Sequence, residues 1–318
     1  MTFSRAHVDA WAEACSAMGN EIADADGFVA VRALLRRFDA KLVLRPLLVE
    51  AMLCEAADAR DLGSATERWR LLVDSDKYTF TENALTEEGS SAPLPSRFRN
   101  TIAHELTHSL AFRAKEFGID LTLPAARGNQ KPSDVVKEVE RHTEKLSPLL
   151  LAPERALDGW FPHTLERLTP DHLTAARRSM GISRFVLIQR LNLLRSYGDG
   201  RMIERRCFRN VAVGVGSWAR DGRAVLKGWP LFVRFDNNES PAFASALRRA
   251  KSMDASMLTS DPSFVFNGGD AHAIALEVPA GTEKNPESTT LRLELLVENS
   301  KRRTGGSFYF AARRVDGT

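Results

Sequence analysis

Two histidines four residues apart, with a glutamate between them, form the pattern in this sequence that is best suited to chemistry. The run is the HExxH sequence His104-Glu105-Leu106-Thr107-His108. Side chains four apart share one face of a helix, so two imidazoles placed in this way can bind one Zn²⁺ at about 2.0–2.1 Å. Glu105 lies one position round from His104, where it could take a proton from a water without being a ligand. The spacing predicts a zinc-dependent hydrolase; the alternative is a histidine pair on an ordinary amphipathic helix.

Residues 97–112 must be helical for these side chains to converge, and their apolar spacing predicts such a helix. Its buried stripe should consist of Phe98, Ile102, Leu106 and Leu110. His104 and His108 fall next to this stripe, where a cleft could form.

A catalytic zinc site needs a third protein ligand and one open position. A second helix, expected from about residue 134 to 151 and stopped by Pro153, offers four candidates. They are Glu138, Glu140, His142 and Glu144. Glu140 and Glu144 face the same way, so one could bind metal while the other accepts a hydrogen bond from a ligand histidine. Such glutamate pairs are also common on solvated helix faces, so the spacing alone does not identify the ligand.

Residues 97–108 read RFRNTIAHELTH, and residues 140–147 read ERHTEKLS, followed by LLAP at 150–153. Both segments resemble the ImmA/IrrE (DUF955) family of zinc metallopeptidases, whose active-site helix typically reads R-x-R-F-T-x-A-H-E-x-x-H. The resemblance implies that His104, His108 and Glu140 hold the metal. Asn100 replaces the usual Phe, and Thr143-Glu144 replaces the usual Ala/Cys-Asn/Asp. The second departure leaves His142 as an alternative ligand, and we favour Glu140.

The resemblance also implies a metalloendopeptidase with Glu105 as its catalytic base. The expected cofactor is Zn²⁺, with Mn²⁺ or another divalent metal as the alternative, because ligand type alone does not set metal selectivity. A second electrophile often assists such reactions, and the sequence offers three candidates without choosing between them. These are Tyr78, His142 and His163.

The composition describes a soluble globular protein of 318 residues, with 43% apolar and 27% charged residues. A net charge of +3 demands neither a nucleic acid nor a membrane as partner. No apolar run approaches the ~20 residues that span a bilayer, and the N-terminus does not resemble a signal peptide. The three cysteines, Cys15, Cys54 and Cys207, are too scattered for a disulfide framework or a thiolate metal site. A cytoplasmic location is therefore expected.

We expect an α+β protein of three parts. Residues 1–160 should form a mainly helical, zincin-like peptidase domain whose small sheet contains strands near 41–54 and 68–73. Residues 161–202 should form a helix-turn-helix-like region around Gly181, and residues 203–318 a strand-rich domain that is GAF-like by analogy of domain order. Further helices are expected at 6–18, 28–38 and 242–252, loops at 81–96 and 127–132, and strands at 229–235, 272–278, 291–297 and 308–311.

IrrE-like proteins are proteases that cleave a helix-turn-helix transcriptional repressor and so switch on a stress regulon. The resemblance implies that role here, with a repressor protein as substrate and no membrane partner, and it leaves the oligomeric state open. Between Arg167 and Arg209, ten arginines face only three acidic residues, as in a phosphate-contacting module or in solvated connecting helices. The alternative function is therefore a DNA-binding transcriptional regulator whose zincin fold is structural or inactive.

Overall fold

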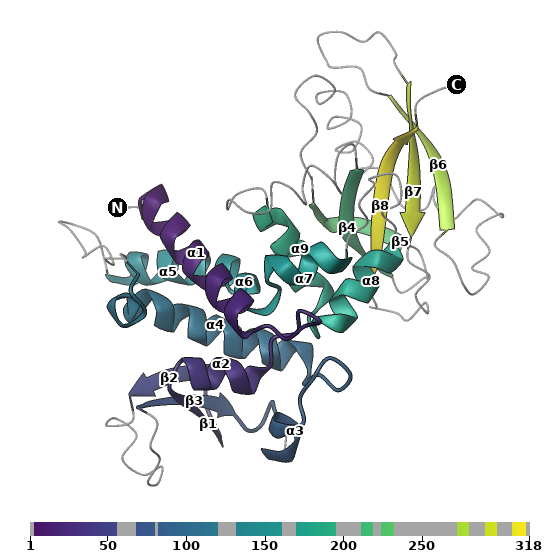
Figure 1. Cartoon of the computed structure of the whole chain (residues 1–318). Helices are drawn as coiled ribbons and strands as arrows, with labels where there is room; N and C mark the ends of the chain where they lie inside the picture. The colour runs from purple at the N-terminus through teal and green to yellow at the C-terminus, as the bar shows by residue number, and fades with distance from the viewer. Residues whose placement is uncertain are drawn as a thin grey trace. The chain divides into compact units, whose positions relative to one another are not determined.

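The chain is described here by a computed structural model, which confirms the predicted α+β class (Figure 1). The described residues are 3–55, 68–79, 82–119, 132–160, 170–194, 211–218, 224–231, 272–279, 290–297 and 307–315. They belong to two compact units, each taken by itself below. The first comprises Met1–Gly159 and Arg177–Val186, and the second Trp160–Ala176 and Leu187–Thr318. No helix among the described residues is long and apolar enough to cross a membrane.

Helices in the first unit follow the predicted apolar periodicity, with some additional short elements. They are α1 (Arg5–Ile22), α2 (Val31–Arg37), α3 (Glu82–Thr86), α4 (Ser96–Phe112), the 3-10 helix Ala114–Phe117, α5 (Pro132–Leu146), α6 (Pro148–Leu151) and α7 (Glu154–Trp160). Helix α3 lies within the segment predicted to be a loop, and α7 was not predicted. The helix predicted from 134 to 151 is divided in two, because Pro148 has no N–H with which to continue the backbone ladder.

A three-stranded sheet accompanies these helices, with β3 (Trp69–Asp74) at its centre. Strand β1 (Ala40–Arg45) pairs with β3 in parallel, and β2 (Ala51–Glu55) pairs with its other edge in antiparallel fashion. The segment predicted as one strand over 41–54 is therefore two strands. Proline is poorly tolerated inside a strand, and Pro46 follows directly after the end of β1.

Helix α4 lies in the core of this unit. Its predicted stripe is confirmed: Phe98, Ile102, Leu106 and Leu110 are at most 1% exposed. Helix α1 packs against it, and the indole Nε1 of Trp11 donates a hydrogen bond to the Thr107 carbonyl at 3.2 Å. This contact satisfies the buried indole and fixes α1 beside the HExxH turn.

The predicted helix pair around Gly181 is confirmed as α8 (Pro170–Ser179) and α9 (Arg184–Leu194). Gly181 has a φ of +60°, and a Cβ atom there would lie 2.9 Å from the Phe28 ring and 2.8 Å from Pro93. Glycine is therefore required both by the backbone conformation and by the close approach. This turn, with residues 177–186, belongs to the first unit.

The second unit contains a five-stranded antiparallel sheet in the order β5-β4-β8-β7-β6. The strands are β4 (Val211–Trp218), β5 (Ala224–Leu231), β6 (His272–Pro279), β7 (Thr290–Val297) and β8 (Ser307–Val315). Strands β6, β7 and β8 agree with the predictions, β5 begins earlier than expected, and β4 was not assigned. The helix at 242–252, and the loop at 127–132 up to residue 131, lie outside the described residues. The GAF-like assignment stays a prediction.

Candidate metal centre

Helix α4 brings His104, Glu105 and His108 to its surface beside the buried stripe. The two histidine side chains are each 19% exposed, and their rings meet edge to face with centroids 4.8 Å apart. The predicted geometry of the HExxH turn is thus present, since residues four apart share this face of the helix.

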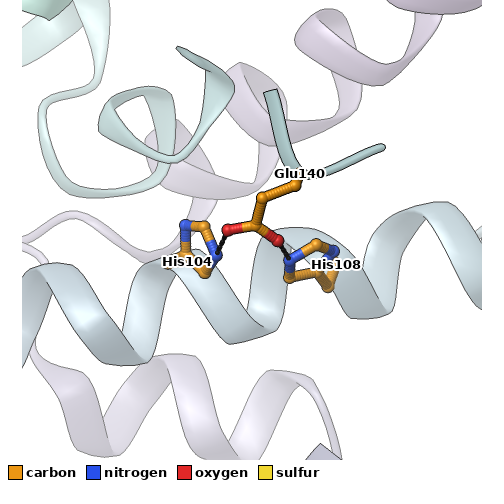
Figure 2. Close-up of side chains that lie close together, drawn as sticks. All are labelled: His104, His108 and Glu140. Atoms are coloured by element: carbon orange, nitrogen blue, oxygen red, sulfur yellow. Dashed lines mark hydrogen bonds and ion pairs between the residues drawn. The ribbon is translucent and has the colours of Figure 1, made fainter. Parts of the chain in front are cut away.

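Glu140, on helix α5, faces both rings (Figure 2). Its Oε1 lies 3.0 Å from Nε2 of His104, and its Oε2 lies 2.9 Å from Nε2 of His108. Among the described residues these are the three side chains grouped closely enough to hold a metal ion, with ligand atoms within 4.8 Å of one another. The structure therefore brings together the three residues that the family resemblance proposed as ligands.

The chemistry of these atoms fits a divalent cation. A carboxylate oxygen and an unprotonated Nε2 are both hydrogen-bond acceptors, so their close approach requires either a proton or a cation between them. Two ligands bound tetrahedrally at about 2.0–2.1 Å from Zn²⁺ lie about 3.3 Å apart, close to the separations found here. Burial lowers the pKa of His108, as does the charge of the neighbouring His104, which favours the neutral imidazole that a metal needs.

Thr143 contacts the outer side of His108. Its Oγ1 lies 3.1 Å from Nδ1 of His108, and its side chain is fully buried. When Nε2 of His108 is left free for a metal, Nδ1 carries the proton and donates it to Thr143. The prediction that Glu144 could fill this role is wrong: Glu144 is exposed and makes no hydrogen bond to either histidine. A change of one residue along α5 moves the side chain by about 100° round the helix, which explains the difference.

The carboxyl group of Glu105 is largely removed from water. Burial, reinforced by the charge of Glu140, raises its pKa to about 7, although the Leu53 N–H donates a hydrogen bond to it. Leu53 belongs to the edge strand β2, so this strand lies directly beside the HExxH turn. A carboxyl group with this pKa can both accept and return a proton near neutral pH.

The three residues predicted as candidates for a second electrophile differ in their surroundings. The Tyr78 hydroxyl is hydrogen-bonded to the Glu50 carboxylate and lies 3.2 Å from Thr101 Oγ1, one helical turn before His104 on α4. The ring of His142 instead packs edge to face against Phe3 with centroids 5.4 Å apart, and so makes no contact with the His104–Glu140 pair. His163 lies outside the described residues.

A cluster that the sequence analysis did not find fixes the start of β2 to α4. Arg97 donates two hydrogen bonds to Glu50, from Nε at 3.1 Å and from Nη2 at 2.9 Å, and Thr101 Oγ1 donates one at 2.9 Å. These bonds hold the pKa of Glu50 down to about 2, with the hydrogen bond from Arg97 as the largest cause. No motif links a glutamate at a strand end with an arginine 47 residues later, so the pairing had no signal in the sequence.

An exposed aromatic ring lies beside the candidate metal centre, and other exposed apolar side chains occur on the elements that carry or adjoin it. Phe112, 66% exposed, follows His108 by four residues, and the two rings stack with centroids 6.4 Å apart. Val136, also 66% exposed, precedes Glu140 by four residues on α5, and Met52, 42% exposed, adjoins Leu53. Large apolar side chains left in water beside a site of this kind are typical of binding surfaces.

The arginines proposed for phosphate contact are not all available to a ligand. Arg190 on α9 is 2% exposed, and Arg184 is half-buried. A buried guanidinium cannot reach a phosphate, so the ten arginines of this segment include at least one that is not available for such a contact. The amino-acid composition of residues 167–209 indicates how many arginines the segment contains, but it does not indicate which helix face carries them.

Comparison with known proteins adds little to this picture. No family model matches the chain. No curated protein matches it either. One solved structure, described as a Mycobacterium tuberculosis transcriptional regulator, is similar to this chain with 12% identity and a TM-score of 0.41. The match covers 95% of this chain and 74% of that chain. A likeness this weak carries no argument about function.

Proposed function

We propose that the first unit is a metal-dependent endopeptidase of the ImmA/IrrE type. His104, His108 and Glu140 would hold Zn²⁺, or Mn²⁺ as the alternative, and Glu105 would be the general base. The single observation that supports this most strongly is the Glu140 carboxylate facing both Nε2 atoms at 2.9–3.0 Å, beside Glu105.

When bound, the metal would supply Lewis-acid chemistry, polarising a peptide carbonyl and making water more acidic. Glu105 takes the proton of the attacking water and returns it to the leaving amine. The N–H of Leu53 orients that carboxylate from the strand beside it. Thr143 holds His108 in the tautomer that leaves Nε2 free.

The proposed substrate is a helix-turn-helix transcriptional repressor, cleaved to switch on a stress regulon. Support for the repressor comes from the resemblance of residues 97–108 and 140–153 to the family. We further propose that the cleaved segment carries large apolar residues next to the scissile bond. The exposed apolar side chains of Phe112, Val136 and Met52 support this preference.

Metal content and cleavage test this proposal together. Wild-type protein and Glu105→Gln should each bind about one zinc ion, measured by elemental analysis, while His104→Ala should lose it. The wild type and the matched control His7→Ala, which replaces a histidine on α1, should both cut a purified repressor encoded beside the gene, whereas Glu105→Gln and His104→Ala should not. Cleavage that survives Glu105→Gln, or a wild type that binds no divalent metal, contradicts the proposal.

The second candidate is a DNA-binding regulator with a structural or inactive zincin fold. The arginines of residues 167–209 favour it, although the burial of Arg190 removes one of them. A salt-dependent mobility shift of duplex DNA that weakens in Arg184→Gln, with no cleavage of the repressor, would support this function over the first.

A further inference from the structure

A cavity of about 740 Å³ lies on the opposite edge of the small sheet from β2, among residues of α2, β1 and α3. None of its lining residues belongs to α4 or α5, so it is distinct from the metal centre. Its volume falls within the range of about 300–1,000 Å³ that small-molecule sites occupy.

Arg32 and Arg36 from α2 line this cavity, and Lys41 of β1 adjoins it, on the opposite face of the strand from Leu42 and Leu44. Arg32 and Arg36 are four residues apart, so they share one face of the helix. All three side chains are exposed, and none of them forms an ion pair with a residue in the described part of the chain. Arg37 on the same helix is different, because it pairs with Glu21 at 3.3 Å.

The acidic side chain at the cavity offsets only one of these positive charges. It is Asp39, whose Oδ2 also accepts a hydrogen bond from the Arg68 backbone N–H at 3.3 Å. The cavity therefore has an excess of positive charge, which attracts an anion.

The remaining wall is apolar. Leu35 is 5% exposed, and Leu42 and Leu85 are half-buried. Alternate residues of a strand face the same side, so Leu42 and Leu44 line the cavity together from β1. An apolar wall below unpaired cations is complementary to a molecule with an apolar body and an anionic end.

We infer that this cavity binds a small amphipathic anion, an aliphatic or aromatic body that carries a carboxylate, phosphate or sulfonate. The guanidinium groups of Arg32 and Arg36 bind the anionic group, since arginine presents several N–H donors in a fixed planar fork. Leu35, Leu42 and Leu85 contact the apolar body. This inference does not depend on the peptidase proposal.

The test uses the full chain and two naphthalene probes. The anionic probe is 8-anilinonaphthalene-1-sulfonate, and the uncharged one is N-phenyl-1-naphthylamine; both are followed by fluorescence titration. The double variant Arg32→Glu/Arg36→Glu should weaken sulfonate binding at least tenfold and change binding of the uncharged probe less than twofold. Arg37→Glu, a charge reversal on the same helix outside the cavity, should leave both affinities unchanged.

A competition experiment distinguishes the contribution of the ligand's apolar body from that of its anionic group. Decanoate should displace the sulfonate probe at concentrations at least tenfold lower than those of inorganic phosphate, and Leu85→Glu should abolish this advantage. Circular dichroism of each variant verifies that the fold is retained. Equal probe affinity in wild type and the double variant, or phosphate competing as well as decanoate, overturns the inference.

Discussion

The Oγ1 atom of Thr143 lies 3.1 Å from Nδ1 of His108, so the two helices of the metal centre are joined by a hydrogen bond as well as through Glu140. Thr143 is fully buried, which protects this bond from competition by water. Its position fixes the orientation of the imidazole before any metal arrives.

Replacing Thr143 by Val should weaken zinc binding by about 10–100-fold, the usual cost of losing such a supporting hydrogen bond. Valine has nearly the same shape, so the helix packing should survive. A chelator competition assay measures the affinity. Thr143→Ser keeps the hydroxyl and should keep the affinity; a Val variant that binds zinc as tightly as the wild type would contradict this role.

Arg99 should be among the most costly residues of the first unit to replace. It is fully buried with Glu88, and its Nη2 also donates to the carbonyls of Val29 at 2.8 Å and Met180 at 3.1 Å. Arg99→Met leaves the Glu88 carboxylate buried without its partner, at a cost of about 3–5 kcal/mol in the free energy of unfolding. Urea unfolding measures the loss.

Arg97→Met is the matched control on the same helix. The Arg97 side chain is 74% exposed, and pairs of that kind contribute about 0–1 kcal/mol. Similar losses in the two variants would show that burial does not govern the contribution of Arg99.

Stability should depend on pH through Glu50. Its pKa is about 2 in the folded chain, against an ordinary value of 4.5, so its contribution is fully present above about pH 4.5. The contribution is lost as the pH falls toward 2, because the carboxylate is protonated. The free-energy difference between wild type and Glu50→Gln should therefore be smaller at pH 3 than at pH 7. Chemical denaturation at both values measures it, and a difference that does not change with pH would refute the assignment.

Alanine variants of two glycines with positive φ should distinguish the cost of backbone strain from the cost of steric overlap in the free energy of unfolding. Gly118→Ala, where φ is +68° and no atom of the described residues lies within 4 Å of the added Cβ, should cost only the conformational ~1–2 kcal/mol. Gly27→Ala, where φ is +81°, also places the Cβ 2.2 Å from Ala156 Cβ and should cost at least ~3 kcal/mol. Thermal unfolding compares them, and equal shifts in Tm would rule out the overlap.

Phe112 should affect substrate choice if the peptidase proposal holds. Phe112→Ala should lower kcat/KM about tenfold for peptides with a large apolar residue at the cleavage site, and much less for polar ones. Zinc content should stay unchanged, because Phe112 is not one of the proposed ligands. Phe185→Ala, an exposed phenylalanine on α9, is the control. A uniform loss across both peptide classes would indicate damage to the fold instead.

The parts of the site that could be predicted are those with a periodic pattern. The four-residue spacing of Phe98, Ile102, Leu106 and Leu110 determined which side of α4 is buried, and hence where the histidines emerge. Glu140 required the family resemblance, since spacing alone left four candidates on its helix.

The parts that could not be predicted depend on tertiary contacts. Thr143 is a single hydroxyl in a charged helix, and only the packing of α5 on α4 gives it a partner. The burial of Arg190 likewise follows from what packs against it, which the local composition does not contain. The division of the segment at 41–54, by contrast, has a local cause in Pro46, directly after the end of β1.

The bond from Arg99 to the Met180 carbonyl has a practical consequence for the isolation of the first unit as a fragment. A truncation at residue 160 would remove that carbonyl and would also uncover the Phe28 ring against which Gly181 packs. A recombinant fragment should therefore extend through Val186, the last residue of the first unit, to retain both contacts.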